Sequence, residues 1–365
     1  MIAVRPALLA LLPVLACSAL AQGGARAPAA PAQATVRYAM LPLRNLSADP
    51  SGAVELETRM RAGLAARGAA FVPAAELDRV LIDRRVRYTD SLSAEDARAL
   101  RAATGADFGL AGVVFDCARG TEPRIAASLR VIDLVSGERV QSAFFTQRGV
   151  DARGLLGLGA IEDASELESR AVERLLAAFR DRGGPLVLPA VAEAARARHA
   201  NPPRAAAPSA LRIAVLPFLN RSTRPEAGAS FAELLAHAWF RARGAQIVEA
   251  GELRAALRRA RIRTLNEVDA ATMASIGELL DVRWFALGSV DRFGEETVVR
   301  DRRYPEVEVH VRLVDARTGL VTASRSVRLR GDASEGLLRL GAEHDVLQLA
   351  RDVARELVLA LEVEP

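Results

Sequence analysis

The sequence predicts an α/β (α+β) fold built from two tandem copies of one mixed-sheet domain, each with the element order βαβααβββα and with helices packed on the sheet. Three observations support this prediction. The 365-residue chain repeats itself at a nearly constant offset, helical and strand periodicities alternate within each copy, and turn residues separate the periodic segments.

The internal repeat is visible in two matched stretches. Residues 40–45 (MLPLRN) match residues 215–220 (VLPFLN) at an offset of 175. Residues 129–133 (LRVID) match residues 311–315 (VRLVD) at an offset of 182. Matches that lie between these two stretches have an offset of 176. The second copy therefore gained one residue before them and six residues after them, the six in one hairpin loop.

The repeat also sets the predicted domain boundaries. The first copy covers 35–182 and the second covers 211–365, each near the usual size of an independent domain. Residues 183–210 are rich in Ala and Pro and are expected to form a semi-stiff linker. Residues 22–34 are expected to form a tether of the same kind.

The first half of each copy should alternate strands and helices, as the second copy shows more clearly. A short buried strand over 213–217 ends at a proline. Apolar residues at i, i+3, i+4 and i+7 predict a helix through 231–238, and a glycine follows where it would end. A brief strand at 247–248 precedes helices over 251–259 and 273–280.

The second half should form an antiparallel sheet and a closing helix. Residues 284–290 are apolar enough for a central strand, whereas 307–313 alternate apolar and polar residues, as a half-solvated strand does. Turn chemistry at 315–319 leads into an antiparallel strand over 321–329. The closing helix is predicted over about 335–361.

The first residues have the features of an export signal: Arg5 is followed by an apolar run over 7–16 and then by small residues. Two processing routes remain open. Signal peptidase would remove 1–21, whereas lipoprotein processing would remove 1–16 and acylate Cys17. About ten apolar residues are too few for a bilayer span, which needs roughly twenty, so no transmembrane helix is expected.

Charge and cysteine content argue against nucleic-acid binding and against thiol chemistry. All 49 basic residues are arginine, yet the formal net charge is only +4, too balanced for an electrostatic nucleic-acid binder. The chain has two cysteines, and either processing route removes Cys17 from thiol chemistry. Cys117 closes an apolar run and is interpreted as a buried structural thiol rather than a redox or interchain one.

No motif in the sequence indicates catalysis. The four histidines, His199, His237, His310 and His344, have no metal-binding spacing and are interpreted as solvated or hydrogen-bonded. Nucleophile elbows, Walker loops and dinucleotide fingerprints are absent. We therefore expect a protein that is not an enzyme, with no catalytic, cofactor-binding or metal-binding residues and no cofactor.

Two sets of matched polar residues are candidates for partner binding. They are the arginine doublets and the asparagines at strand ends, namely Arg85, Arg87, Arg261, Arg263, Asn45 and Asn220. Arginine pairs suit carboxylates or phosphates, and hence an acidic partner surface, peptidoglycan or lipid headgroups. The alternatives are a solvated helix face for the arginines and turn hydrogen bonds for the asparagines.

The opening strand, the Gly-Ala-x-Ile-Val-Glu turn and the Ala-Leu-Gly-Ser-Val strand together resemble a known group. They carry Leu216, Pro217, Phe218, Asn220, Gly244, Glu249, Leu253, Gly288 and Ser289. The chain resembles the CsgG/LpoB/TolB-amino-terminal-domain family, in a tandem arrangement like that of FlgT. In the first copy Pro73 lies near the place of Glu249, and Val113 replaces Ser289.

The resemblance implies an envelope protein and specifies fold better than function. Members include curli-secretion pores and lipoprotein activators of penicillin-binding proteins. A CsgG-type pore is not expected, because its membrane hairpins need roughly forty additional residues per domain. The longest candidate insert, 291–306, is shorter than that and rich in Arg and Glu.

The sequence therefore favours a non-catalytic binding or assembly module of a periplasmic or outer-membrane machine. It would reside in the periplasm, anchored to the outer membrane if Cys17 is acylated. Its partners would be an envelope protein complex, which could include further copies of the chain. One alternative is a periplasmic hydrolase or small-ligand-binding protein with a site between the two domains. Another is a degenerate first copy that serves only as a spacer.

Overall fold

The computed structural model of the chain describes residues 36–152, 159–178, 211–262, 269–299, 302–333 and 342–361. The described residues belong to one compact unit. The predicted signal, the tether, the linker, Cys17 and His199 lie outside the described residues. No helix of the described segments is long and apolar enough to cross a membrane.

The first copy contains the elements that its sequence predicts, with an additional two-residue strand and a 3-10 helix. They are β1 (Arg37–Met40), β2 (Arg44–Asn45), α1 (Gly52–Ala65), β3 (Ala70–Phe71), α2 (Ala74–Asp83), α3 (Ala94–Thr104), β4 (Phe108–Ala118), β5 (Arg124–Asp133), β6 (Arg139–Arg148), the 3-10 turn η1 (Gly149–Ala152) and α4 (Ala164–Ala177).

The second copy repeats this order. Its elements are β7 (Arg212–Val215), β8 (Leu219–Asn220), α6 (Ala227–Arg243), β9 (Gln246–Ile247), α7 (Ala250–Arg259), α8 (Ala270–Leu280), β10 (Trp284–Val299), β11 (Arg302–Asp315), β12 (Val321–Arg330) and α9 (Val346–Ala360).

Each copy folds into one mixed sheet, which confirms the predicted fold class. The strand orders are β3-β1-β4-β5-β6 and β12-β11-β10-β7-β9, with β2 paired to β4 and β8 paired to β10. The first strand of each copy runs parallel to its neighbours, whereas the last three strands form antiparallel ladders. Short parallel strands joined by helices and long antiparallel hairpins account for this mixture.

The two sheets share their irregularities as well as their order. The ladder of β4 and β5 shifts register between Val114 and Asp116, and the ladder of β10 and β11 shifts between Val290 and Arg292. These positions correspond at the offset of 176 found in the sequence. A bulge is specified locally by the residues that form it, so its recurrence supports the internal repeat.

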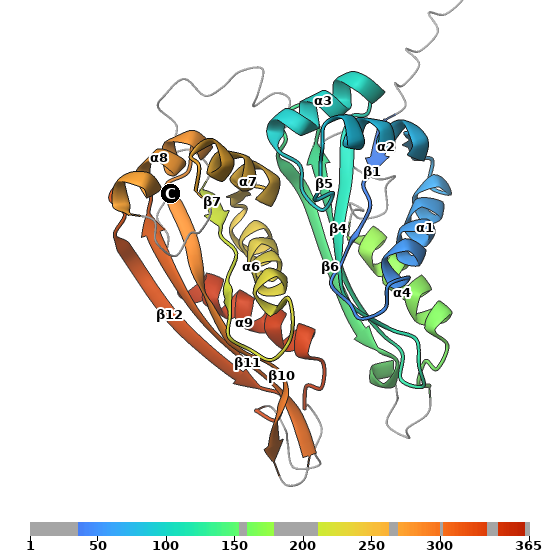
Figure 1. The fold of residues 1–365 in the computed structure, drawn as a ribbon. Coiled ribbons are helices and arrows are strands. Elements are labelled where there is room, and N and C mark those ends of the chain that lie inside the picture. Colours follow the sequence, from blue (N-terminus) through green and yellow to red (C-terminus); the bar gives the residue numbers. More distant parts are fainter. Residues whose placement is uncertain are drawn as a thin grey trace, which may run out of the picture. The chain divides into compact units, whose positions relative to one another are not determined.

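Helices pack on both faces of each sheet, but they leave part of one face of the second sheet open. Figure 1 shows α1 and α4 on one side of the first sheet, and α6 and α9 on the side of the second sheet that faces the first. The first-copy residues Val113, Phe115 and Ala126 join the hydrophobic core formed by α6 and α9. The sequence predicts a separate core for each copy, but the structure adds a core that both copies share.

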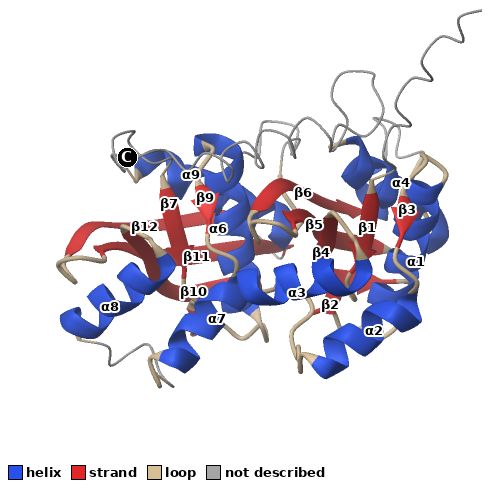
Figure 2. Ribbon diagram, turned by 90° about the horizontal axis from the view of Figure 1, so that it is seen from above, coloured by secondary structure: helices blue, strands red, loops and turns tan. Residues whose placement is uncertain are grey.

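The shorter helices α2 and α3 of the first copy, and α7 and α8 of the second, lie on the same side of the molecule when it is viewed from above (Figure 2). Each pair packs on its own sheet, with Leu77 and Leu100 buried in the first copy and Leu253 and Ile276 in the second. The loops and helix ends of these pairs form the site described below.

The closing helix is shorter than predicted. Residues 342–345 are not helical, and α9 begins at Val346. Asp345 is its N-cap, and its side chain accepts hydrogen bonds from the backbone of Leu347 at 2.8 Å and of Gln348 at 3.3 Å. Before it, the backbone N–H of Glu343 donates to the carbonyl of Gly331 at 2.8 Å. These local bonds replace helical ones and delay the start of the helix.

Candidate functional site

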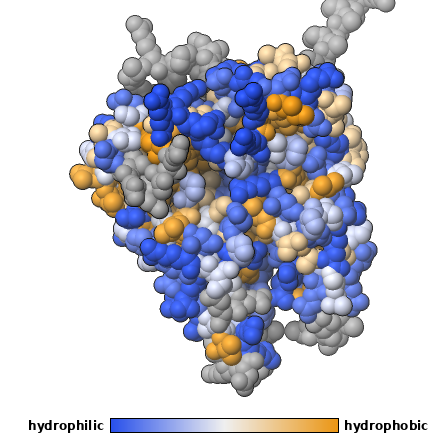
Figure 3. Space-filling view, in the orientation of Figure 1, coloured by the Kyte–Doolittle hydropathy of each residue, from blue (hydrophilic) through white to orange (hydrophobic). Residues whose placement is uncertain are grey.

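An arginine-lined pocket lies where the two copies meet. Its volume is about 690 Å³, and it is bounded by residues that follow α2, by the start of α3 and by α7. Six of the lining residues are arginines and two are acidic: Arg84, Arg85, Arg87, Arg254, Arg258, Arg259, Glu95 and Asp96. In Figure 3 hydrophilic side chains gather over α7 and the neighbouring part of α3.

Both acidic residues of this arginine pocket are already paired. Arg84 binds Glu95 at 2.7 Å and Asp96 at 3.1 Å, and Arg259 reaches Glu95 at 3.3 Å. On the opposite wall, Arg254 lies over the ring of Tyr88 at 4.6 Å. These contacts link the residues that line the pocket, and they pair both of its carboxylates with arginines.

Three arginines of the pocket remain available to a ligand. Arg85, Arg87 and Arg258 are exposed, and none of them forms an ion pair with a described residue. Guanidinium groups present several donors in a planar fork and bind carboxylates or phosphates with two bonds. The pocket therefore offers a concentrated positive surface for an anionic group.

Arg85 occupies a backbone position that favours glycine. Its φ is +54°, and the backbone N–H groups of Arg85 and Val86 donate to the carbonyls of Ile82 and Leu81, each at 2.9 Å. This is a Schellman ending of α2, in which the left-handed residue is usually glycine. Arg261 ends α7 in the same way, with a φ of +58°. An arginine at this position costs about 1 kcal/mol in backbone conformation.

We therefore expect Arg85→Gly to leave the free energy of unfolding unchanged or raise it by up to about 1 kcal/mol, because glycine adopts the left-handed conformation without strain. The same change removes a guanidinium from the arginine pocket and should weaken anion binding. Urea unfolding and a binding titration measure the two effects. Arg85→Gln is the matched control, since it keeps the backbone strain and loses only the charge; destabilisation by Arg85→Gly would contradict the prediction.

The two predicted arginine doublets lie in different places relative to the arginine pocket. Arg85 and Arg87 line the pocket, whereas Arg261 does not, and Arg263 lies outside the described residues. The pocket is completed by Arg254 and Arg258 of α7, which carry no motif that could have identified them. Their contribution depends on how the second copy packs against the first.

A buried ion cluster fixes that packing. Arg130 on β5 and Arg139 on β6 come from the first copy, and their side chains are 2% exposed. They face Glu233 on α6 and Glu249 before α7, both from the second copy. Arg139 Nε lies 2.8 Å from Glu249 Oε1. Two buried positive charges and two negative ones therefore meet across the junction.

Glu249 stays ionised in this cluster. Burial raises the pKa of the Glu249 carboxyl, but Arg139 and Arg130 outweigh that effect and hold the pKa below its ordinary value. The Ser91 hydroxyl also donates to Glu249 at 3.2 Å and accepts from the backbone N–H of Gly251 at 2.7 Å. These bonds join the base of the arginine pocket to the buried cluster.

A second contact between the copies involves His237 of α6. Its Nδ1 lies 2.8 Å from the hydroxyl of Ser142 on β6, so the histidine is hydrogen-bonded, as one of the sequence interpretations held. Burial, and then the nearby Arg139, Arg241 and Arg351, lower the pKa of His237 to about 3. The folded protein therefore keeps this ring neutral.

The low pKa of His237 predicts acid sensitivity. The unfolded chain takes up a proton below about pH 6.5, whereas the folded chain does not until about pH 3. The contribution is intact above pH 6.5 and declines by up to about 1.4 kcal/mol per pH unit below it. In NMR titrations the His237 ring should not titrate between pH 5 and 8, and His237→Gln should flatten the stability profile over pH 4–6.5. A His237 titration near pH 6.5 would refute this prediction.

Asn45 and Asn220 close matching loops. The Asn45 side chain accepts from the backbone N–H of Ser47 at 2.9 Å and donates to the carbonyl of Asp49 at 2.6 Å. Asn220 makes the same two bonds, to Ser222 and Arg224, at 3.0 and 2.8 Å. These are turn hydrogen bonds, the alternative to partner binding for these two residues. Neither asparagine lines the arginine pocket.

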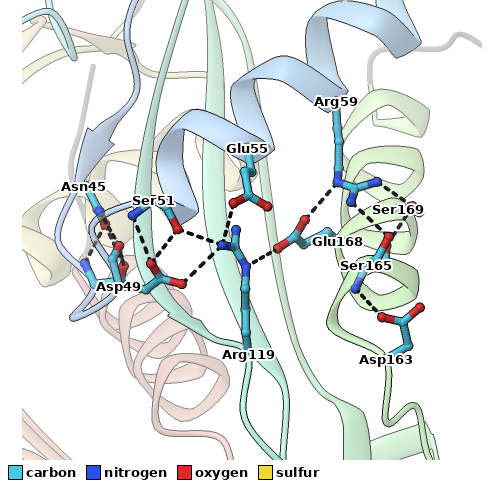
Figure 4. Close-up of polar contacts among 11 residues, drawn as sticks. Asn45, Asp49, Ser51, Glu55, Arg59, Arg119, Asp163, Ser165, Glu168 and Ser169 are labelled. Atoms are coloured by element: carbon cyan, nitrogen blue, oxygen red, sulfur yellow. Dashed lines mark hydrogen bonds and ion pairs between the residues drawn. The ribbon is translucent and has the colours of Figure 1, made fainter.

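A structural ion network supports the Asn45 loop (Figure 4). Arg119 binds Glu55 at 2.7 Å and Glu168 at 2.8 Å, and Arg59 binds the other oxygen of Glu168 at 2.8 Å. The network joins α1, the end of β4 and α4. The Glu168 side chain is only 4% exposed, and a buried charge is costly unless it is paired. Two arginines of the first copy provide that pairing.

Among the described residues, the remaining titratable groups are paired, buried or scattered. Cys117 is buried, and burial raises the pKa of its thiol to about 11, which makes it unreactive. His310 contacts Ser324 at 3.3 Å, and His344 stacks on Tyr304 with the ring centroids 5.5 Å apart. Within the described segments, no group of histidine, cysteine and acidic side chains could hold a metal ion.

No protein-family model matches the sequence, and no curated protein matches it. The chain is similar to the PelC dodecamer from Paraburkholderia phytofirmans, with 16% identity, a TM-score of 0.30, and coverage of 42% of this chain and 90% of that chain. It is similar to lipoprotein GNA1162 from Neisseria meningitidis, with 21% identity, a TM-score of 0.29, and coverage of 38% and 96%.

A third similar structure is the LpoB C-terminal domain from Salmonella enterica, with 11% identity, a TM-score of 0.28, and coverage of 37% of this chain and 90% of that chain. One protein named in the predicted family resemblance is therefore among the similar structures.

Proposed function

We propose that the chain is a non-catalytic binding or assembly module of the bacterial envelope, and that the arginine pocket holds an acidic segment of a partner protein. One observation carries this proposal: six arginines and two acidic residues line a pocket of about 690 Å³, and the acidic residues are already paired. The volume exceeds that of a single small anion, so a segment with several carboxylates fits the pocket better.

The envelope location is supported by the predicted export signal, and the mature amino terminus tests it. Mass spectrometry of the protein from its native host should find either an acylated Cys17 or a free terminus at Gln22. The first result would place the chain on the membrane as a lipoprotein, and the second would make it a free periplasmic protein. An unprocessed Met1 would overturn the proposed location.

Binding is tested with the full mature chain and a fluorescent oligoglutamate peptide. Replacing Arg85, Arg87 and Arg258 together by glutamine should weaken peptide binding by at least about tenfold, because the loss of even one charge-assisted bond costs about 1.5 kcal/mol. The control carries glutamine at Arg174, Arg317 and Arg355, exposed arginines outside the pocket, and has the same net charge. Equal weakening in both variants would show only nonspecific attraction and would overturn the proposal.

The same variants distinguish the other anionic partners. Peptidoglycan sacculi and vesicles with about one-fifth anionic lipid replace the peptide in parallel titrations. If only one of these binds, and binding depends on the three pocket arginines, the acidic-segment assignment is wrong. Salt should weaken each of these interactions, since solvent-exposed charges are screened within about 10 Å at 0.1 M.

A small cavity between the copies is the place where the alternative, a small-ligand or hydrolase site, would lie. A cavity of about 160 Å³ lies at the junction, and its charged lining residues are Arg44, Asp90, Arg139, Glu233 and Arg254. Both carboxylates already face arginines within 4 Å. Because both carboxylates are engaged in ion pairs that join the two copies, we assign them a structural role and propose no catalytic function for this cavity.

A further inference from the structure

The repeat allows one surface of the first sheet to be compared position by position with the same surface of the second. Arg130 on β5 pairs with Ser142 on β6, and Arg312 on β11 pairs with Ser324 on β12. Both pairs correspond at the offset of 182 that relates the two sequences. Arg312 therefore holds the same place in the second sheet that Arg130 holds in the first.

In the first sheet this surface is a helix-binding face. The helix α6 of the second copy packs on it, and Val113, Phe115 and Ala126 lie in the core that α6 enters. Glu233 of α6 places its carboxylate on Arg130. The contact combines apolar burial with the buried ion cluster, of which the pair of Arg130 and Glu233 is one part. The covering is permanent because both elements belong to one chain.

Below α8, the equivalent face of the second sheet is not covered by any described helix. The positions that correspond to Val113, Phe115, Ala126 and Phe144 hold Ser289, Asp291, Glu308 and Ser326. A groove of about 520 Å³ runs over this face, and Arg312 lines it. In Figure 1 the sheet of β10, β11 and β12 has α8 at its upper end and no helix below it on that side.

Charge on this open face is balanced except at Arg312. Asp291 faces Arg221 at 3.6 Å, and Glu308 binds Arg292 at 3.2 Å. Arg312 is exposed and forms no ion pair with a described residue. Arg312 is therefore the counterpart of Arg130, but it has no carboxylate partner like Glu233 among the described residues.

We propose that the open face of the second sheet reversibly binds an acidic helix of a partner protein, with a carboxylate on Arg312 as Glu233 lies on Arg130. The replacement of apolar by polar residues suits such a partner. A face that is exposed whenever the partner is absent must be soluble, and interfaces that form and separate are more polar than permanent ones. This site is separate from the arginine pocket and does not depend on the function proposed there.

A second copy of the chain fits this face less well. Its available helix would be α1, the counterpart of α6, because the buried Met60 and Leu235 correspond at an offset of 175. That alignment places Thr58 where α6 carries Glu233. Without a carboxylate at this position, α1 cannot form the pair with Arg312, so the partner is a different protein.

The test uses the full chain and a defined helical peptide. The probe has the sequence of residues 226–243 with Phe231, Leu235 and Trp239 replaced by glutamine for solubility, and a matched probe also carries Glu233→Gln. The unmodified probe should bind, and Arg312→Gln in the chain or Glu233→Gln in the peptide should each weaken binding about tenfold. The two changes together should cost no more than either alone.

Arg325→Gln is the control, because Arg325 lies on the neighbouring strand β12, is exposed and gives the same change in net charge. It should bind the probe as the unaltered chain does. A photo-crosslinker at Ser326 should label the probe, whereas labelling only at the first sheet would indicate displacement of α6 and overturn the proposal. No binding at millimolar probe, or equal loss in Arg312→Gln and Arg325→Gln, would overturn it as well. Arginine-pocket variants should bind this probe normally, which separates the two proposals.

Discussion

Glu249→Gln is expected to lower the free energy of unfolding by about 3–5 kcal/mol, the cost of leaving buried charge uncompensated. Glu249 is buried, lies 2.8 Å from Arg139 and 3.5 Å from Arg130, and comes from the other copy. With glutamine in its place, two buried guanidinium groups share only Glu233. Urea unfolding of the full chain measures the change.

Two variants make this result interpretable. Glu95→Gln removes an exposed glutamate and should change stability by less than about 1 kcal/mol. The double variant Glu249→Leu with Arg139→Leu removes both charges and should recover most of the loss, since well-packed apolar residues can replace a buried pair. If Glu249→Gln costs less than 1 kcal/mol, the cluster does not hold the copies together.

Glu249 should also make the stability of the chain depend on pH. Because the pKa of Glu249 is lowered in the folded protein, its contribution is intact above its ordinary value of 4.5 and is lost as the pH falls below that value. His237 acts over the neighbouring range, between about pH 6.5 and 3. Stability of the unaltered chain should therefore decline from pH 6.5 downward, and Glu249→Gln should be less sensitive than the unaltered chain below pH 4.5.

Gly251→Val should destabilise the chain by about 3 kcal/mol and loosen the contact between the copies. A Cβ at Gly251 would lie 2.6 Å from the carbonyl oxygen of Ser91 and would also clash with the backbone of Leu92. Both belong to the first copy, and backbone atoms cannot move aside as a side-chain end can. Overpacking of this kind typically costs 1–3 kcal/mol, and backbone contact puts Gly251 at the upper end.

Unfolding and hydrogen exchange together measure the effect of Gly251→Val. Exchange should increase at β5 and β6, which contact the second copy, and remain unchanged within the ladder of β10 and β11. Gly120→Ala is the matched control, because a Cβ at Gly120 would meet nothing within 4 Å. A Gly251→Val chain within 0.5 kcal/mol of the unaltered one would show that the copies can shift apart freely.

Much of the fold could be predicted because its signals are local. Helical periodicity through 231–238 and strand alternation over 307–313 need only neighbouring residues, and both elements are confirmed as α6 and β11. The start of the closing helix could not be predicted. It depends on the capping by Asp345 and on the bond between Glu343 and Gly331, two residues outside regular elements that are twelve positions apart.

The candidate site could be predicted only in part. The doublet of Arg85 and Arg87 stood out because it recurs, and the structure places both residues in the arginine pocket. Arg254 and Arg258 could not be recognised, because an arginine on an exposed helix face has no distinguishing pattern. Their role appears only when α7 is placed beside the residues that follow α2.

By itself, the sequence determined the repeat, the element order and the residues that differ between the copies, since each of these is written in local periodicity and in register. Tertiary structure alone decided that the copies share a core, that Glu249 pairs with Arg139, and that Arg130 is buried while Arg312 is exposed. The physical reason is that these outcomes depend on contacts between residues more than one hundred positions apart. Such contacts leave no periodicity in the sequence, and the burial that gives each charge its energy exists only after the two copies have packed.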